Sequence, residues 1–354
     1  GLWYIDDWSF TESDDSGEPV EPGGGNLSVA YISPDGDDSN PGTKDAPLKT
    51  LKSAFQQLAG DTIYFLEGVY HEEVEVKDFS GTASKPKVIT VYPGHKVKFD
   101  GTVPVHSSWE LHEGNIYKTT IDQDIWQLFE NEKMLNAARW PNVEGFIEDE
   151  QPLAPLPHSN SLWDQPGTWG KSAHNSTNGN MIDDGTQNLA GVEISFTSGI
   201  AVLNIGSFRS SSARIFSHNP GESWFRYYSE DLKVHWEKPD KAYYYIEGKL
   251  SLLDKAGEWF YEPSTKELYV WTKSGAKPDS ASIRGKTHTY GISFENCDHV
   301  KVKDIEFFAT TISGVDCEDF TVENNIFSYP SHSKRMLRDQ AKAAVTEFMG
   351  NNKE

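Results

Sequence analysis

Two windows of the chain, Ile292-Ser-Phe-Glu-Asn-Cys-Asp-His-Val-Lys-Val302 and Ile312-Ser-Gly-Val-Asp-Cys-Glu-Asp-Phe-Thr-Val322, carry one apolar pattern at an interval of 20 residues. A short β-pattern repeated in this way is typical of a coiled sheet, in which each turn lays a strand over the equivalent strand of the turn before. Cys297 and Cys317 coincide in the two windows and are predicted to share an interior column. A buried pair of free thiols is favoured over a disulfide, because Cα atoms one turn apart are at the short end of disulfide geometry.

A similar period is present near the start of the chain. Short strands are predicted at 61–66, 73–76, 88–91 and 97–99, and Ile63 and Ile89 are separated by 26 residues. A helix that ends with Gly60 in the C′ position is predicted before them, on the apolar positions Leu48, Leu51, Phe55 and Leu58. One helix before a run of strands is suited to cap the open end of a solenoid.

The composition limits the classes of partner. The chain has 354 residues and a formal net charge of −22, with 36% hydrophobic residues but 11 Trp, 15 Tyr and 18 Phe. This aromatic content favours β-structure with exposed aromatic surface over a helical bundle. The acidic balance argues against nucleic acid and anionic membranes as partners. No membrane span is predicted, because no run of about 18 apolar residues is present.

The middle of the chain, residues 105–285, loses the turn period. Glu258-Trp-Phe-Tyr261 and Leu268-Tyr-Val-Trp271 flank a turn-rich segment, which is a hairpin signal. The segment is therefore predicted to be an all-β insertion packed on the solenoid. The period resumes after it and fails again beyond Tyr329, and a helix is predicted from Arg338 to Phe348.

Several segments carry a family resemblance. The opening Tyr31-Ile-Ser-Pro-Asp-Gly and the later Gly60-Asp-Thr-Ile-Tyr64 resemble the start of the right-handed parallel β-helix proteins that degrade polysaccharides, both lyases and glycoside hydrolases. Ala138-Arg-Trp-Pro-Asn142 and Leu253-Asp-Lys-Ala-Gly-Glu258 are similar to the inserted β-subdomain of the β-helix glycoside hydrolases. The resemblance implies an all-β fold: a right-handed parallel β-helix with an N-terminal cap helix and an inserted antiparallel β-subdomain.

The resemblance also guides the division of the chain. Residues 1–12 resemble the last strand of jelly-roll carbohydrate-binding modules, and the Pro-, Gly- and acid-rich stretch after them has the composition of a flexible linker. Such a β-helix would continue for further turns, so we expect the chain to be a fragment that can lack the catalytic turns. The predicted parts are the end of an upstream β-sandwich module (1–12), a linker (13–28), the N-terminal cap and first turns (29–104), the insertion (105–285), further turns (286–331) and a terminal loop and helix (332–354).

Candidate catalytic carboxylates follow from the turn period. Glycoside hydrolysis requires two carboxyl groups, about 5–5.5 Å apart for retention and about 6.5–9.5 Å apart for inversion. Strands one turn apart are about 4.8 Å from each other, so equivalent acids such as Asp298 and Glu318 approach the retaining separation. Asp316, Glu318 and Asp319 form the densest acidic cluster beside the repeat, and Asp316 and Glu318 are the predicted catalytic pair. The alternative is that these acids are turn corners that face water.

Other residues are candidates for binding. His332, Lys334 and Arg335 concentrate basic groups that could hold an acidic or sulfated sugar, although a solvated loop is an equal alternative. Arg139 and Trp140 could stack on a sugar ring, or they could be core residues. No cofactor is predicted to be required. Asp35, Asp37 and Asp38 could ligate calcium, but their segment also has plain turn chemistry, which we favour.

These observations predict a secreted or cell-surface glycoside hydrolase that acts on a plant or algal cell-wall polysaccharide. Two alternatives stay open, a polysaccharide lyase that eliminates beside a uronate and a non-catalytic carbohydrate-binding or adhesion fragment. The predicted partner is a polysaccharide or oligosaccharide in each case. The sequence carries no signal for an oligomeric state.

Overall fold

The structure is a computed structural model, and it divides the chain into two compact units. It describes residues 25–105, 108–142, 167–206, 209–232, 238–279, 282–330, 332–337, 343–344 and 347–349. Within these residues, unit 1 consists of Pro104–Gly285 and Ser333–Lys342, and unit 2 of the chain up to Val103, Lys286–His332 and the segment from Ala343. The predicted module end, 1–12, and most of the predicted linker, 13–28, lie outside the described residues.

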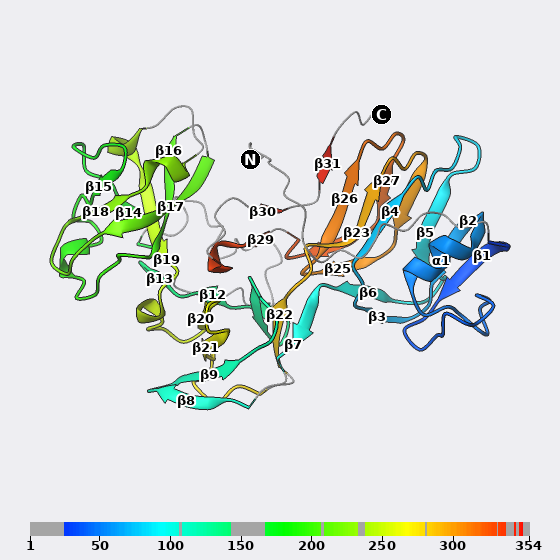
Figure 1. Cartoon of the computed structure of the whole chain (residues 1–354), viewed down its shortest axis with the longest axis horizontal. Helices are drawn as coiled ribbons and strands as arrows, with labels where there is room; N and C mark the ends of the chain where they lie inside the picture. Colours follow the sequence, from blue (N-terminus) through cyan, green and yellow to red (C-terminus); the bar gives the residue numbers. More distant parts are fainter. Residues whose placement is uncertain are drawn as a thin grey trace. The chain divides into compact units, whose positions relative to one another are not determined.

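Unit 2 contains three sheets in which every pair of neighbouring strands is parallel (Figure 1). The first sheet has the order β1 (Leu27–Ile32), β2 (Leu58–Phe65), β5 (Lys87–Val91), β24 (Val300–Lys303) and β27 (Thr321–Glu323). The second has the order β4 (Val74–Lys77), β23 (Tyr290–Glu295), β26 (Thr311–Val315) and β31 (Glu347–Met349). The third has the order β3 (Gly68–Tyr70), β6 (Val97–Asp100), β25 (Glu306–Phe308) and β28 (Ile326–Ser328).

The register of these sheets confirms both intervals predicted from the sequence. Ile292 lies opposite Ile312 on the neighbouring strand, and Ile63 lies opposite Ile89. Cys297 and Cys317 are buried free thiols that hydrogen-bond each other, as the favoured interpretation predicted. The contact with Cys317 and burial raise the pKa of Cys297.

Aromatic rings stack through the interior of unit 2 from strand to strand. Phe99 on β6 lies 5.5 Å from Phe307 on β25, measured between ring centroids, and Phe307 lies 4.9 Å from Phe327 on β28. Phe65 on β2 contacts Phe99 edge to face at 5.2 Å. Parallel pairing in register places equivalent side chains above one another, so the repeat in sequence becomes a column in space.

The cap helix α1 (Leu51–Gln57) is shorter than predicted and lies against β1 and β2 (Figure 1). It begins after Thr50, which accepts a hydrogen bond from a first-turn amide, as N-cap residues do. The prediction that Gly60 ends the helix is wrong, because Gly60 lies inside β2. A Cβ atom there would be 1.8 Å from the carbonyl oxygen of Ser28, so glycine permits the close approach of β1.

The predicted C-terminal helix from Arg338 to Phe348 is also wrong where the structure describes it. Short strands occur instead, β30 (Ala343–Ala344) and β31. Ser313 of β26 pairs with Glu347 of β31 in parallel. Pairing satisfies the backbone groups that β26 would otherwise expose at the sheet edge, and this outweighs local helix propensity.

Unit 1 is built mainly from two sheets, one of seven strands and one of five. The first has the order β13 (Arg139–Trp140), β19 (Tyr243–Glu247), β16 (Ile200–Gly206), β17 (Arg209–Ser217), β18 (Trp224–Tyr227) and β15 (Asn180–Ile182), with β14 (Gly170–Lys171) also paired to β19. The second has the order β12 (Asn136–Ala137), β20 (Glu258–Glu262), β21 (Glu267–Trp271), β9 (Ile116–Thr120) and β8 (Glu110–Glu113). The β20–β21 pairing confirms the predicted hairpin.

The remaining described elements are short. A four-stranded sheet has the order β11 (Lys133–Met134), β10 (Leu128–Glu130), β22 (Ile283–Lys286) and β7 (Thr102–Pro104), and β29 (His332–Ser333) pairs with β30. The 3-10 turns are η1 (Leu189–Gly191), η2 (Ser229–Asp231), η3 (Pro239–Lys241), η4 (Leu250–Leu252) and η5 (Arg335–Leu337). The described chain is thus mostly β, as predicted, and it contains one of the two predicted helices, α1. The insertion is not purely antiparallel, because β12 and β20 run parallel.

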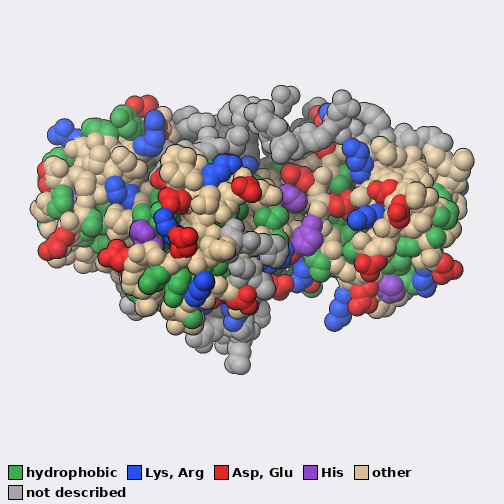
Figure 2. All heavy atoms as spheres, turned by 60° about the horizontal axis from the view of Figure 1, so that its bottom comes forward, with side chains coloured by type: hydrophobic (Ala, Val, Ile, Leu, Met, Phe, Trp, Pro, Cys, Tyr) green, Lys and Arg blue, Asp and Glu red, His purple; other side chains and the backbone are tan. Residues whose placement is uncertain are grey.

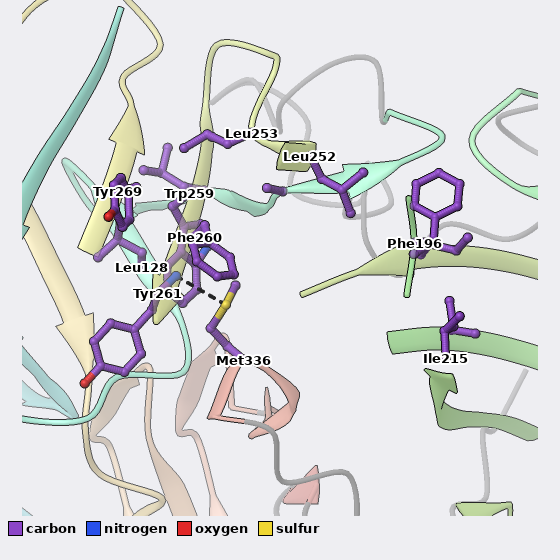
Figure 3. Packing of buried hydrophobic residues seen from close by; sticks show 14 of the residues in the cluster. Leu128, Phe196, Ile215, Leu252, Leu253, Trp259, Phe260, Tyr261, Tyr269 and Met336 are labelled. Atoms are coloured by element: carbon purple, nitrogen blue, oxygen red, sulfur yellow. Dashed lines mark hydrogen bonds between the residues drawn. The ribbon is translucent and has the colours of Figure 1, made fainter. Parts of the chain in front are cut away.

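The core of unit 1 includes a residue from the C-terminal segment. Met336 of η5 is buried and points toward Phe260 and Tyr261 of β20 (Figure 3). The amide of Tyr261 donates a hydrogen bond to Met336 Sδ at 3.4 Å. A polarisable thioether in contact with aromatic rings fills such gaps well, so η5 is fixed to the hairpin.

No helix within the described residues is long and apolar enough to cross a membrane.

Lys and Arg side chains are dispersed among Asp and Glu on the face that Figure 2 presents.

Candidate functional site

The structure brings the predicted acids of unit 2 together at the corner that follows β26. Asp316 and Glu318 are both exposed, and Asp316 has a positive φ of 53°. The amide of Glu318 donates to Asp298 Oδ1 at 2.8 Å, and its carbonyl accepts from the amide of His299. Asp298 therefore ties one turn to the next, while the side chains of Asp316 and Glu318 face solvent.

The predicted aromatic and cationic pair of unit 1 does not form one surface. Arg139 is only 3% exposed, and its guanidinium lies 3.7 Å from the ring centroid of Tyr245. The same guanidinium donates to the carbonyl oxygens of Pro141 and Thr168. Trp140 is half-buried. Arg139 is therefore a core residue, in agreement with the alternative given for it.

The basic loop residues Lys334 and Arg335 have partners inside unit 1. Arg335 Nε donates to Glu247 Oε1 at 2.6 Å, and its Nη2 donates to the hydroxyl of Tyr245 at 3.1 Å. Lys334 Nζ lies 4.2 Å from the ring centroid of Trp126. These contacts hold both cations against unit 1. The third residue of the group, His332, lies in β29.

The predicted calcium ligands order the loop before α1. Asp37 Oδ1 accepts from the amide and the hydroxyl of Ser39, and these hydrogen bonds lower the pKa of Asp37. Asp38 Oδ1 accepts from the amides of Lys49 and Thr50, both at 2.9 Å. Within the described part of the chain, no group of three or more His, Cys, Asp or Glu residues could hold a metal ion. The contacts of Asp37 and Asp38 are those of turn and helix-entry residues.

A pocket of about 420 Å³ lies in unit 1, and sequence reasoning missed it. Its walls come from the β20–β21 hairpin and from the segment after β19, and they include Lys249, Leu250, Phe260, Glu262, Glu267 and Tyr269. Glu262 and Glu267 lie directly opposite each other in the hairpin. Because facing residues of an antiparallel pair project to the same side, the register places both carboxylates beside the pocket.

The polar groups of this pocket are held in place. Glu267 accepts from Lys118 Nζ at 2.9 Å and from the hydroxyl of Tyr269 at 3.0 Å, and these bonds lower the pKa of Glu267. Burial and the contact with Glu267 raise the pKa of Tyr269, which keeps it a neutral donor. Lys249 Nζ donates to the carbonyl of Thr197 at 2.6 Å. Most of the lining residues are polar or charged, and Leu250, Phe260 and Tyr269 supply the apolar surface.

A polar group in unit 2 was also missed. His71 Nδ1 lies 3.0 Å from the carbonyl oxygen of Asp100. Burial, and then the nearby His71, lower the pKa of His288, which favours a neutral imidazole. His288 Nδ1 and Thr287 Oγ1 are buried without a hydrogen-bond partner in the structure. A neutral imidazole with an unused nitrogen can accept a proton or a hydroxyl hydrogen bond.

Two buried carboxyl groups have a raised pKa. In unit 2, burial raises the pKa of Glu72 to about 7, and Glu72 Oε2 accepts from the amide of Leu51 at the start of α1. In unit 1, burial and the charge of Asp254 raise the pKa of Glu258 to about 8. Glu258 is 2% exposed, lies outside the pocket lining, and accepts a hydrogen bond from the amide of Asp254 through its Oε2 at 3.4 Å.

Comparisons with known proteins match parts of the chain. No protein-family model matches it. Over 87 residues, 24% of the chain, it is 38% identical to the uncharacterized protein YwoF of Bacillus subtilis. Over 73 residues, 20% of the chain, it is 45% identical to the pectate lyase PEL9 of Emericella nidulans. Each match covers 18% of the relative, so the chain matches less than a fifth of the length of these proteins.

A solved structure extends the likeness to the fold. A glycoside hydrolase superimposes with a TM-score of 0.59 and 20% identity over 79% of this chain and 50% of its own. The complex of XylC with xylose has a TM-score of 0.41 and 18% identity over 85% of this chain and 40% of its own. The resemblance to carbohydrate-active enzymes predicted from the sequence is thus confirmed, in fold by the glycoside hydrolase and in a short segment by the pectate lyase.

Proposed function

We propose that this protein hydrolyses glycosidic bonds of a plant or algal cell-wall polysaccharide and that unit 2 winds as a right-handed parallel β-helix. The observation that carries the proposal is the residue-by-residue stacking of parallel strands in unit 2, in a chain that shares its fold with a glycoside hydrolase over 79% of its length. Secretion or display at the cell surface follows from the location of such a substrate.

The proposal gives each unit a role. Asp316 and Glu318 are the proposed carboxylates, because they are exposed beside the stacked turns where a polymer can reach them. The pocket of unit 1 is proposed to bind a sugar unit, with Glu267 and the hydroxyl oxygen of Tyr269 accepting hydrogen bonds from its hydroxyl groups. Fixed polar groups of this kind can orient a sugar in a pocket.

A polysaccharide lyase is the second candidate, and two observations favour it. One is the segment that is 45% identical to a pectate lyase. The other is His288, a half-buried imidazole whose lowered pKa suits it to remove the proton beside a uronate carboxylate. The base would be His288 in this case, because Lys334 and Arg335 have partners within unit 1.

The products distinguish these functions. Incubation with xylan and with polygalacturonate is expected to generate new reducing ends without ultraviolet absorbance, because hydrolysis adds water across the bond. Reducing ends accompanied by an absorbing unsaturated sugar would instead establish the lyase. Binding of either polymer without new reducing ends would identify a non-catalytic module.

The site assignment has its own test. Asp316→Asn and Glu318→Gln are each expected to lower the hydrolytic rate by about a hundredfold, because each removes a group that transfers a proton or carries charge. Both side chains are exposed, so the melting temperature should stay unchanged. Glu323→Gln replaces an exposed glutamate on the same stack of turns and is the matched control. If both Asp316→Asn and Glu318→Gln hydrolysed the polymer at the wild-type rate, the assignment of these residues as the catalytic carboxylates would be wrong. The description of the fold would not be affected.

A further inference from the structure

Three tyrosines lie together on the outer side of the first sheet of unit 2, and we call Tyr31, Tyr64 and Tyr92 the tyrosine surface. Tyr31 on β1 lies opposite Tyr64 on β2, with ring centroids 5.5 Å apart and planes 23° apart. Tyr92 directly follows β5, and its ring lies 5.6 Å from Tyr64 and 6.0 Å from Tyr31. Two neighbouring strands, and the residue that follows the next strand, thus each supply one ring.

These rings lie outside the buried core of unit 2. The strand neighbours of Tyr31 and Tyr64, which are Ile32, Ile63 and Phe65, are fully buried on the inner face, so alternation places these two tyrosines on the outer face. All three tyrosines are half-buried. None of the three hydroxyls forms a hydrogen bond with another group in the described chain. Tyr70 of the same unit behaves differently, because it is buried and donates to the carbonyl of Leu66 at 2.7 Å.

A cation and an imidazole border the tyrosine surface. Lys44 is exposed, its Nζ lies 4.1 Å from the ring centroid of Tyr92, and it forms no ion pair with another described residue. The ring of His95 meets Tyr92 edge to face at 5.3 Å. His95 Nδ1 accepts from the amide of Glu67 at 2.8 Å, so the proton of the neutral imidazole is on Nε2 and available as a donor. An ammonium group beside an aromatic ring, with no ion pair among the described residues, is a local positive charge in a protein with a net charge of −22.

We propose that the tyrosine surface and Lys44 bind a linear polysaccharide that carries uronate groups. The carbon–hydrogen face of a sugar ring packs on aromatic rings, the free phenol groups and His95 Nε2 can bond to hydroxyls, and Lys44 pairs with a carboxylate. A polymer of repeating rings suits a surface that presents three neighbouring aromatic rings. This inference rests on the proposed function and adds the class of polymer and a second place where it is held.

Binding measurements on the full chain test the proposal. The dissociation constants for polygalacturonate and for xylan are compared among the wild type, Y31A/Y64A/Y92A, K44A and F216A. The triple variant should bind polygalacturonate at least about tenfold more weakly, a change of about 1.4 kcal/mol, because it removes all three rings. K44A should weaken binding of polygalacturonate about fivefold and leave xylan unchanged. F216A removes an exposed ring of unit 1 and should bind as the wild type does.

The outcomes separate this surface from the proposed function. A folded triple variant that binds polygalacturonate within about twofold of the wild type overturns the surface. If K44A bound polygalacturonate with the same dissociation constant as the wild type, the proposed pairing of Lys44 with a uronate group would be wrong. Wild-type protein that binds neither polymer contradicts the proposed function itself. Should the triple variant fail to fold, ring-labelled tyrosine in the wild type decides, because addition of polygalacturonate must shift the signals of these three rings, and unshifted signals reject the proposal.

Discussion

Replacement of Phe307 by alanine is expected to lower the free energy of unfolding of unit 2 by about 3–5 kcal/mol, the range for large aromatic core residues. Phe307 is fully buried and lies between Phe99 and Phe327, with its plane 8° from that of Phe327. Both neighbours are fixed by backbone pairing to β25, so the structure cannot collapse into the space that a missing ring leaves. The cost should therefore fall in the upper part of the range.

Denaturant unfolding followed by far-ultraviolet circular dichroism measures this change. Selective tryptophan fluorescence supplies a separate record of unit 1, because residues 11–103 and 286–354 contain no tryptophan. Phe307→Leu keeps most of the volume and should cost less than about 1.5 kcal/mol. Ile326→Ala truncates a residue of the same sheet that is 62% exposed and should change stability by less than about 0.5 kcal/mol. If Phe307→Ala lowered the free energy of unfolding no more than Ile326→Ala, the stacked rings of Phe99, Phe307 and Phe327 would not stabilise unit 2.

The stacking of unit 2 could be predicted from the sequence because its cause is local and repeated. Each turn places apolar residues at equivalent positions, so Ile292 over Ile312 and Ile63 over Ile89 appear as fixed intervals. The elements at the ends of the stack were predicted less well. Gly60 and the segment after Arg338 have helical signals locally, but the approach of β1 and the open edge of β26 determine their structure. Such constraints come from parts of the chain that are distant in sequence.

The candidate site was predictable only where it follows the period. The pairing of Asp298 with Glu318 across one turn follows from the 20-residue interval. The environment of Arg139 does not, because the ring and the carbonyl groups that enclose it come from other segments of unit 1. The pocket was missed for a similar reason. The hairpin was recognised, but the pairing of Glu262 with Glu267 beside a cavity also depends on the segment around Lys249.

Glutamate 258 is expected to make the stability of unit 1 fall as the pH rises from about 4.5 to about 8. Burial, and then the charge of Asp254, raise the pKa of Glu258 from 4.5 to about 8. Between these values the folded chain keeps a proton that the unfolded chain releases, so each increase in pH favours unfolding. The stabilisation that the proton of Glu258 gives to the folded chain is fully present below pH 4.5 and is lost as the pH rises past about 8. At about 1.4 kcal/mol for each pH unit, the whole change is at most about 5 kcal/mol.

The variant Glu258→Gln isolates this contribution because its side chain is neutral at every pH. Urea unfolding followed by tryptophan fluorescence reports on unit 1, where Trp259 is the next residue. The wild type should lose stability relative to Glu258→Gln across the window between about 4.5 and about 8, whatever the absolute effect of the substitution. Glu110→Gln changes an exposed glutamate of the same unit and should keep the slope of the wild type. Parallel pH profiles for the wild type and Glu258→Gln would mean that Glu258 titrates near its ordinary value, and its carboxylate would then have to be reached by water in the folded protein.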